Sequence, residues 1–153
     1  MSTNYYFKRK NTPQLRKRVV KLLEDSKFIE VKKIVTELDE GIHLGGSAHN
    51  WMFAVEHDTQ YGNVPPFEPN KESLYEYIKS MICGADAEYT LFNEYGCVIT
   101  FDEIKKIIEN YHSGFTMESY YKKYPDCEAE CIIKPNEYET VSDGIRFVHR
   151  EFF

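Results

Sequence analysis

The segment from Ile42 to Trp51, IHLGGSAHNW, concentrates unusual residues in ten positions directly ahead of the strand-like MFAVEH. It contains two histidines, adjacent glycines, a serine, an asparagine and the only tryptophan of the chain. Gly45 and Gly46 predict a tight turn, because glycine adopts backbone angles that other residues avoid. The stretches on either side then predict a hairpin-like pair of strands. A turn does not explain the polar side chains around the glycines, so this segment is the first candidate for a site.

Upstream of this segment the sequence predicts one strand and two helices. The aromatic run NYYFK at residues 4–8 is typical of a short edge strand. Thr12 and Pro13 provide a helix N-cap followed by a proline in the first turn, and apolar residues at helical spacing follow. A break near Asp25 divides this pattern into two helices, and Gly41 is expected to end the second one.

Downstream, the prolines of TQYGNVPPFEPN at residues 59–70 predict a loop, and Asn70 is expected to cap a helix. The stretches EYTLF and CVIT flank NEYG and predict a hairpin. Thr100 and Glu103 predict a capping box at the start of another helix. Residues 112–136 are polar and tyrosine-rich and carry no assignable pattern, while the terminal IRFVHREFF predicts a final strand.

These elements predict an α+β fold, because hairpins and helices occur without a repeated βαβ order. The length of 153 residues predicts a single domain over residues 1–153, with a small, mostly antiparallel sheet flanked by several helices. No run approaches the ~20 apolar residues of a membrane span, and the N-terminus has no apolar signal core. A cytoplasmic protein without a membrane partner is therefore expected.

Charge and cysteine spacing narrow the expected partners. A formal net charge of −6 argues against binding to duplex nucleic acid, although it allows a small anionic ligand in one local pocket. The spacings of Cys83, Cys97, Cys127 and Cys131 contain no CxxC, and the last two cysteines lack evident partner ligands. We therefore expect neither a bound metal nor another cofactor.

Four blocks of the sequence occur in the order found in a widespread family of small bacteriophage proteins. The blocks are Asn4-Tyr5-Tyr6, IHLGGSAHNWMF, NEYGCVITFDEIKKII and SDGIRFVHREFF. The central block resembles the family signature H-I-G-K-S-S-x-G-W-x-F. It keeps His43, Gly45, Ser47, Trp51 and Phe53, and it departs at Gly46, Ala48 and Asn50. The segment from Thr12 to Leu38 has no counterpart where many members carry a CxxC pair, so a family zinc site is not transferred.

The resemblance implies a function in phage counter-defence. Members of this family, or one branch of it, are expected to act as anti-CBASS sponges, which bind the cyclic dinucleotide signals of bacterial immunity and keep them from their effectors. The resemblance thus implies a non-enzymatic protein of the host cytoplasm that sequesters a signal such as 3′3′-cGAMP without cleaving it. Whether it does so as a monomer or a homodimer is left open.

The residues themselves are compatible with such a ligand, which presents two phosphodiesters, ribose edges and two bases. The glycines would allow backbone N–H groups to approach a phosphate, so Gly45→Val is expected to abolish binding without unfolding the protein. Hydroxyl, imidazole and amide groups could form hydrogen bonds, and aromatic rings could stack on bases for ~1–3 kcal/mol each. The candidate ligand-binding residues are Tyr5, Tyr6, His43, Gly45, Gly46, Ser47, His49, Asn50 and Trp51.

Each feature also has an ordinary structural explanation, and two other functions remain open. The glycines could form only a hairpin turn, the tryptophan could belong to the core, and His43 could point outward from a strand. A metal-dependent phosphodiesterase could use ligands drawn from His43, His49, Glu56, His57 and Asp58. An adaptor that inactivates a host protein could use the tyrosine-rich residues 112–126.

Overall fold

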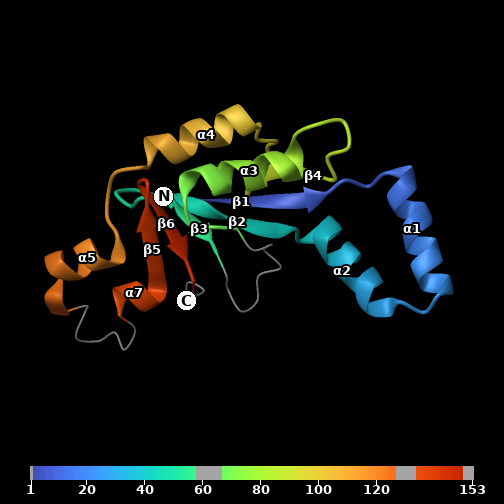
Figure 1. Cartoon of the computed structure of the whole chain (residues 1–153), viewed down its shortest axis with the longest axis horizontal. Helices are drawn as coiled ribbons and strands as arrows, with labels where there is room; N and C mark the ends of the chain where they lie inside the picture. The colour runs from blue at the N-terminus through green and yellow to red at the C-terminus, as the bar shows by residue number, and fades with distance from the viewer. Residues whose placement is uncertain (1, 58–66, 127–133, 150–153) are drawn as a thin grey trace.

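A computed structural model describes residues 2–57, 67–126 and 134–149 of the chain. Its strands are β1 (Ser2–Arg9), β2 (Ile42–Ala48), β3 (Ala54–Glu56), β4 (Tyr89–Asn93), β5 (Glu139–Ser142) and β6 (Ile145–Val148). They form one sheet in the order β4-β1-β2-β3-β6-β5 (Figure 1). Neighbouring strands are antiparallel except β3 and β6, which run parallel. The predicted α+β fold with a mostly antiparallel sheet is therefore confirmed.

The helices are α1 (Pro13–Glu24), α2 (Phe28–Asp39), α3 (Lys71–Ile82), α4 (Phe101–Asn110), α5 (Met117–Lys123) and α7 (Pro135–Tyr138). Three of them, α1, α3 and α4, begin at the N-caps that the sequence predicts. The Thr12 hydroxyl accepts a hydrogen bond from the Leu15 N–H at 3.1 Å, and the Asn70 side chain accepts one from the Ser73 N–H at 2.8 Å. Ser26, with a φ of 57°, lies in the predicted break between α1 and α2.

The hydrophobic core lies between one face of the sheet and the helices α3 and α4 (Figure 1). Successive residues of a strand point to opposite faces, so each strand contributes alternate side chains to this core. On β1, Tyr5 and Phe7 are buried in the core, whereas Tyr6 is half-buried on the other face. The fully buried core residues include Phe7, Leu44, Phe53, Leu74, Ile78, Leu91, Ile104, Ile108, Ile145 and Phe147.

The predicted edge position of NYYFK is wrong. Strand β1 lies inside the sheet, where it pairs with β2 on one side and with β4 on the other. The edge is instead formed by β4, whose residues Tyr89–Asn93 pair with the second half of β1. An aromatic-rich strand is consistent with this interior position, because β1 has buried neighbours on the core face and a strand on each side.

The predicted glycine turn is also wrong, because β2 continues through Gly45 and Gly46 as far as Ala48. A side chain at Gly45 would place its Cβ 2.0 Å from the Ala54 carbonyl oxygen of β3. A Cβ at Gly46 would lie 2.9 Å from the Asn4 side-chain oxygen on β1. The glycines are therefore explained by close approach of both neighbouring strands.

Other predictions are confirmed only in part. Thr100 accepts the Glu103 N–H, but the Glu103 carboxylate accepts the Thr100 hydroxyl at 3.0 Å rather than completing the predicted capping box. Opposite β4, Val98 forms an isolated bridge with Phe92 instead of a second strand. The unassigned residues 112–136 contain α5 and the start of α7.

Some predictions concern residues outside the described part of the chain. These are most of the loop at residues 59–70, the end of the final strand beyond His149, and the pair Cys127 and Cys131. No helix among the described residues is long and apolar enough to cross a membrane.

Candidate functional site

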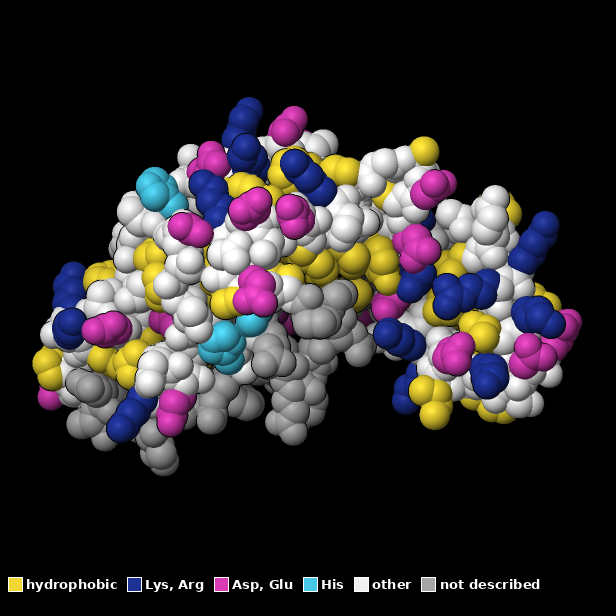
Figure 2. Space-filling view, in the orientation of Figure 1, with side chains coloured by type: hydrophobic (Ala, Val, Ile, Leu, Met, Phe, Trp, Pro, Cys, Tyr) yellow, Lys and Arg dark blue, Asp and Glu magenta, His cyan; other side chains and the backbone are white. Residues whose placement is uncertain are grey.

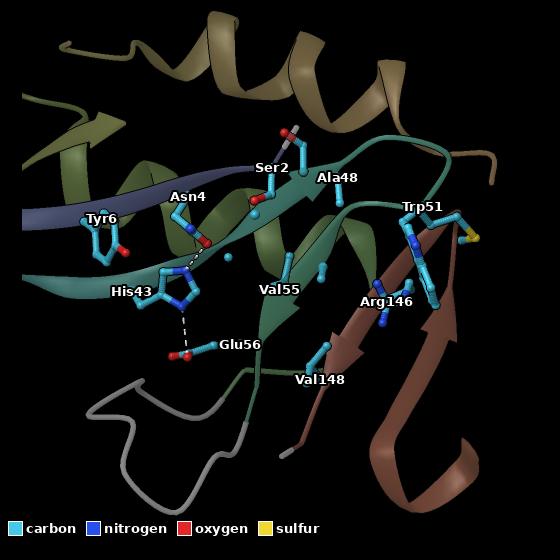
Figure 3. A pocket seen from close by; sticks show the side chains of 15 residues that line it. Ser2, Asn4, Tyr6, His43, Ala48, Trp51, Val55, Glu56, Arg146 and Val148 are labelled. Atoms are coloured by element: carbon cyan, nitrogen blue, oxygen red, sulfur yellow. Dashed lines mark hydrogen bonds and ion pairs between the residues drawn. The ribbon is translucent and has the colours of Figure 1, made fainter. Parts of the chain in front are cut away.

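A cavity of about 520 Å³ lies on the sheet face opposite α3 and α4 (Figure 3). This volume is within the roughly 300–1,000 Å³ typical of small-molecule sites. The cavity lies over the middle of the sheet, because β1, β2, β3 and β6 all contribute residues to its lining. Side chains that define it are Asn4, Tyr6, His43, Trp51, Val55, Glu56, Arg146 and Val148.

One end of the cavity is built around His43 (Figure 3). Its Nδ1 lies 2.9 Å from Oε1 of Glu56, and its Nε2 lies 3.1 Å from Oδ1 of Asn4. The Tyr6 ring lies against the imidazole with 5.0 Å between ring centroids. Burial, with the nearby carboxylates of Glu94 and Glu56, raises the pKa of Tyr6, so its phenol remains a neutral hydrogen-bond donor near pH 7. The imidazole orientation is thus fixed from three sides.

The other end of the cavity is built around Arg146 and Trp51 (Figure 3). The guanidinium carbon lies 4.7 Å from the centroid of the indole, a cation–π arrangement. Arg146 Nε donates to the Glu139 carboxylate, and both side chains are only 3% exposed. Glu139 also accepts the Met117 N–H at the start of α5. Glu139 and the Trp51 ring therefore hold the Arg146 side chain in place at this wall of the cavity. A guanidinium group is a common partner of anionic groups.

Small residues separate these two ends. Along strand β2, Gly45 and Gly46 lie between His43 at one end of the cavity and Ala48 near the other. Ala54 of β3 lies beside them, since it pairs with Gly46. The middle of the cavity is therefore lined by backbone and methyl groups, which leaves room for a flat or bulky ligand.

The structure brings together six of the nine predicted ligand-binding residues. Those that line the cavity are Tyr6, His43, Gly45, Gly46, Ser47 and Trp51. Ser47 is only 5% exposed and interacts with the Tyr5 phenol of the core, so little of its side chain is open to the cavity. The Trp51 ring contacts Phe115 and Tyr120 at 5.8 and 5.0 Å as well as Arg146, so it forms part of a packed aromatic wall.

The other three predicted residues lie elsewhere. Tyr5 is 5% exposed and packs against Phe53 in the core on the opposite face of the sheet, where burial raises its pKa. His49 and Asn50 are exposed in the connection after β2 and do not line the cavity. Asn50 adopts a positive φ of 66°, and its carbonyl accepts the Phe115 N–H at 2.7 Å. Its role in the structure is therefore that of a turn residue.

Two important cavity residues were not among the predicted ligand-binding residues. Arg146 interrupts the otherwise apolar strand IRFV, and a buried charge in such a run is a recognisable signal. The sequence indicates Glu56 only as a candidate metal ligand. The sequence does not show that Glu56 lies beside His43 or Arg146 beside Trp51. These contacts arise only because β3 pairs with β2 and β6 pairs with β3 in the sheet.

The alternative metal site does not assemble in the described part of the chain, where no group of three or more His, Cys, Asp or Glu residues could hold a metal ion. His43 is paired with Glu56, whereas His57 lies beside His149 with 3.4 Å between their Nδ1 atoms. Asp58 is outside the described residues.

Comparison with known proteins finds no matching family model, no matching curated protein and no matching solved structure. The chain is therefore described by its fold and its cavity: an α+β protein with a cavity of about 520 Å³ on the open face of its sheet.

Proposed function

We propose that this protein binds a cyclic dinucleotide immune signal, such as 3′3′-cGAMP, and sequesters it without cleavage in the host cytoplasm as a phage counter-defence protein. One observation carries the proposal: the cavity has an aromatic side chain with a charged neighbour at each end and small residues between them. A cyclic dinucleotide has a matching layout, since two bases project from one compact ring of riboses and phosphates.

The end formed by Tyr6, His43 and Glu56 suits one base. The Tyr6 and His43 rings offer stacking surfaces, and stacking contributes ~1–3 kcal/mol per base. A carboxylate accepts more than one hydrogen bond. Glu56 can therefore remain paired with His43 and also accept hydrogen bonds from adjacent N–H donors of a base. Guanine presents two such donors on its Watson–Crick edge, which supports a ligand containing guanine.

The end formed by Trp51 and Arg146 suits a phosphate and the second base. The planar guanidinium matches the oxygens of a phosphodiester, and its contact with Glu139 holds it in place without the entropy cost of ordering a free side chain. A sponge must compete with tight effectors, which requires a nanomolar Kd, about −12 kcal/mol. Such preorganised groups support that affinity.

The test is to bind the ligand and recover it. The protein is titrated calorimetrically with 3′3′-cGAMP and a panel of other cyclic dinucleotides, then incubated with a slight excess, heat-denatured and analysed by chromatography. We expect nanomolar binding and intact recovery. Tyr6→Ala should weaken binding at least ~10-fold, as expected for loss of a stacking ring, while the exposed Tyr95→Ala serves as the matched control. Linear products that accumulate would indicate an enzyme instead, and absence of binding across the panel would favour the adaptor.

A further inference from the structure

Helices α1 and α2 form a helical hairpin, residues 13–39, that extends beyond one end of the sheet (Figure 1). Buried polar contacts fix its base. Glu37, 3% exposed, accepts Arg9 Nε at 2.7 Å and the Tyr89 hydroxyl at 2.9 Å. Arg9 also lies 3.1 Å from Glu88. The hairpin is therefore held in a defined orientation relative to β1 and β4.

The helical hairpin carries an unusual amount of exposed apolar surface. Of the nine large hydrophobic residues exposed in the described chain, five lie on it: Val20, Leu23, Phe28, Ile29 and Val35. Phe28 and Ile29, at the start of α2, are 63% and 87% exposed. Because such surface is costly to leave in water, its concentration on one projecting element marks an interaction surface.

Charge is distributed unevenly along the chain. The helical hairpin, residues 13–39, contains seven Lys and Arg against five Asp and Glu, a formal charge of +2, whereas residues 42–153 contain nine against nineteen, a formal charge of −10. Figure 2 shows Lys and Arg side chains around the apolar surface of the hairpin. On α1, Arg16, Lys17 and Lys21 line the same groove as Val20.

A complementary surface lies at the other end of the β1–β4 pair. We call residues 94–103 the acidic surface, because they contain Glu94, Asp102 and Glu103 and no Lys or Arg. It also carries exposed Tyr95 and Val98. The register pairs Arg9 with Tyr89 near the hairpin and Tyr5 with Asn93 just before Glu94, so the start of the acidic surface, Glu94 and Tyr95, lies at the end of the ladder opposite the hairpin. The hairpin and this end of the ladder cannot meet within one chain.

We propose that the helical hairpin binds the acidic surface of a second copy of this chain, in a two-fold dimer with two equal contacts. Two hairpins facing each other would oppose like charges, whereas a hairpin against the acidic surface pairs unlike charges and covers apolar side chains on both partners. A two-fold axis beside the edge strand β4 exchanges the two ends of the ladder, so both contacts form together and the assembly closes. Nucleic acid would pair with the basic residues but leave Phe28 and Ile29 uncovered. This dimer does not depend on the proposed ligand.

Sedimentation of the intact protein tests the dimer. Wild type should sediment as a dimer that weakens as salt is raised, because salt screens the exposed charges. Ile29→Glu should weaken dimerisation at least ~10-fold, as expected for a central apolar contact, with circular dichroism confirming that the variant is folded. Val141→Glu, on the exposed edge strand β5, is the matched control and should remain dimeric.

Charge exchange distinguishes this pairing from any other dimer. Arg16→Glu with Lys17→Glu, and separately Glu94→Lys with Asp102→Lys, should each give monomers. Mixing the two variants should give a heterodimer. In one contact the hairpin and the acidic surface are both wild type, and in the other both carry reversed charges, so unlike charges face each other in both contacts. A monomeric wild type, a dimer insensitive to Ile29→Glu, or a mixture that stays monomeric would overturn the proposal, as would a monomer whose hairpin binds nucleic acid instead.

Discussion

At position 45 the structure replaces one explanation of a glycine with another. The sequence pattern favoured a turn that brings backbone amides to a phosphate, whereas Gly45 lies within β2 under the Ala54 carbonyl oxygen of β3. The close approach at Gly45 comes from β3, which pairs with β2 in the sheet. The residues next to Gly45 in the sequence therefore do not reveal it. The glycine itself is still informative, because it marks a place where something approaches the backbone closely.

We therefore expect Gly45→Ala to destabilise the fold, in contrast to a purely ligand-related glycine. The added Cβ collides with backbone, and overpacking costs ~1–3 kcal/mol or more. Urea unfolding followed by circular dichroism measures the change. Gly96→Ala is the control, since its φ is +81° but nothing lies within 4 Å of the new Cβ; it should show only the left-handed strain of ~1–2 kcal/mol. Equal losses at both positions would contradict the crowding at Gly45.

Glu56→Gln should change ligand preference rather than folding. The amide keeps the size of the side chain but replaces one acceptor by a donor, which opposes the donors of guanine. We expect at least a ~10-fold loss for a guanine-containing cyclic dinucleotide and a much smaller loss for one with only adenine, a difference of ~1.4 kcal/mol or more. Calorimetry with both ligands measures this. Glu76→Gln on the exposed side of α3 is the control, and an unchanged preference in Glu56→Gln would count against the assigned base contact.

At the scale of elements, the starts of α1, α3 and α4 were predictable, whereas α5, α7 and the order of the strands were not. Thr12, Asn70 and Thr100 act on N–H groups three residues away, so a short window contains the whole signal. Strand pairing joins distant segments, and an interior strand such as β1 cannot be told from an edge strand by its own residues. The cavity residues were likewise predictable only in part. His43 and Trp51 lie in the central segment that the sequence indicates as a site. Arg146 could not be predicted, because its place depends on the pairing of β6 with β3.

The buried ion pair between Arg9 of β1 and Glu37 of α2 provides a prediction at this scale. Arg9→Met leaves the Glu37 carboxylate buried without its cationic partner, and breaking a buried pair costs ~3–5 kcal/mol. The double variant Arg9→Met with Glu37→Leu removes both charges and should recover much of this loss. Chemical unfolding of wild type, both single variants and the double variant gives the coupling energy. Strict additivity would show that the pair does not act as a unit.

At the scale of the whole molecule, buried tyrosines link stability to alkaline pH. Burial raises the pKa of Tyr75 and Tyr89 to about 12, with further contributions from Glu109 and Glu37 respectively. Burial also raises the pKa of Tyr77. A tyrosine whose pKa is higher when folded binds its proton more tightly in the folded state. Its contribution is complete below the unfolded value of 10.0 and is lost as pH rises toward 12.

We therefore expect the free energy of unfolding to fall steadily from pH 10 to pH 12. Urea titrations across this range measure the slope, and tyrosine absorbance follows ionisation. Tyr77→Phe should flatten the decline. Its hydroxyl is buried without a hydrogen-bond partner among the described residues, so this variant should be as stable as wild type or ~1 kcal/mol more stable at pH 7. A slope that is unchanged by Tyr77→Phe would contradict a buried, titrating phenol.

The parallel pairing of β3 with β6 has a consequence for synthesis on the ribosome. Residues that meet across this pair, such as His57 and His149, are 92 positions apart. Pairing over such a separation is slow compared with local structure, and it must wait until β6 has been translated. Arg146 and Val148, which form one wall of the cavity, come from that strand. A nascent chain arrested before β6 would therefore expose the open side of β3 and lack a complete cavity, so the cavity forms only once translation of β6 is finished.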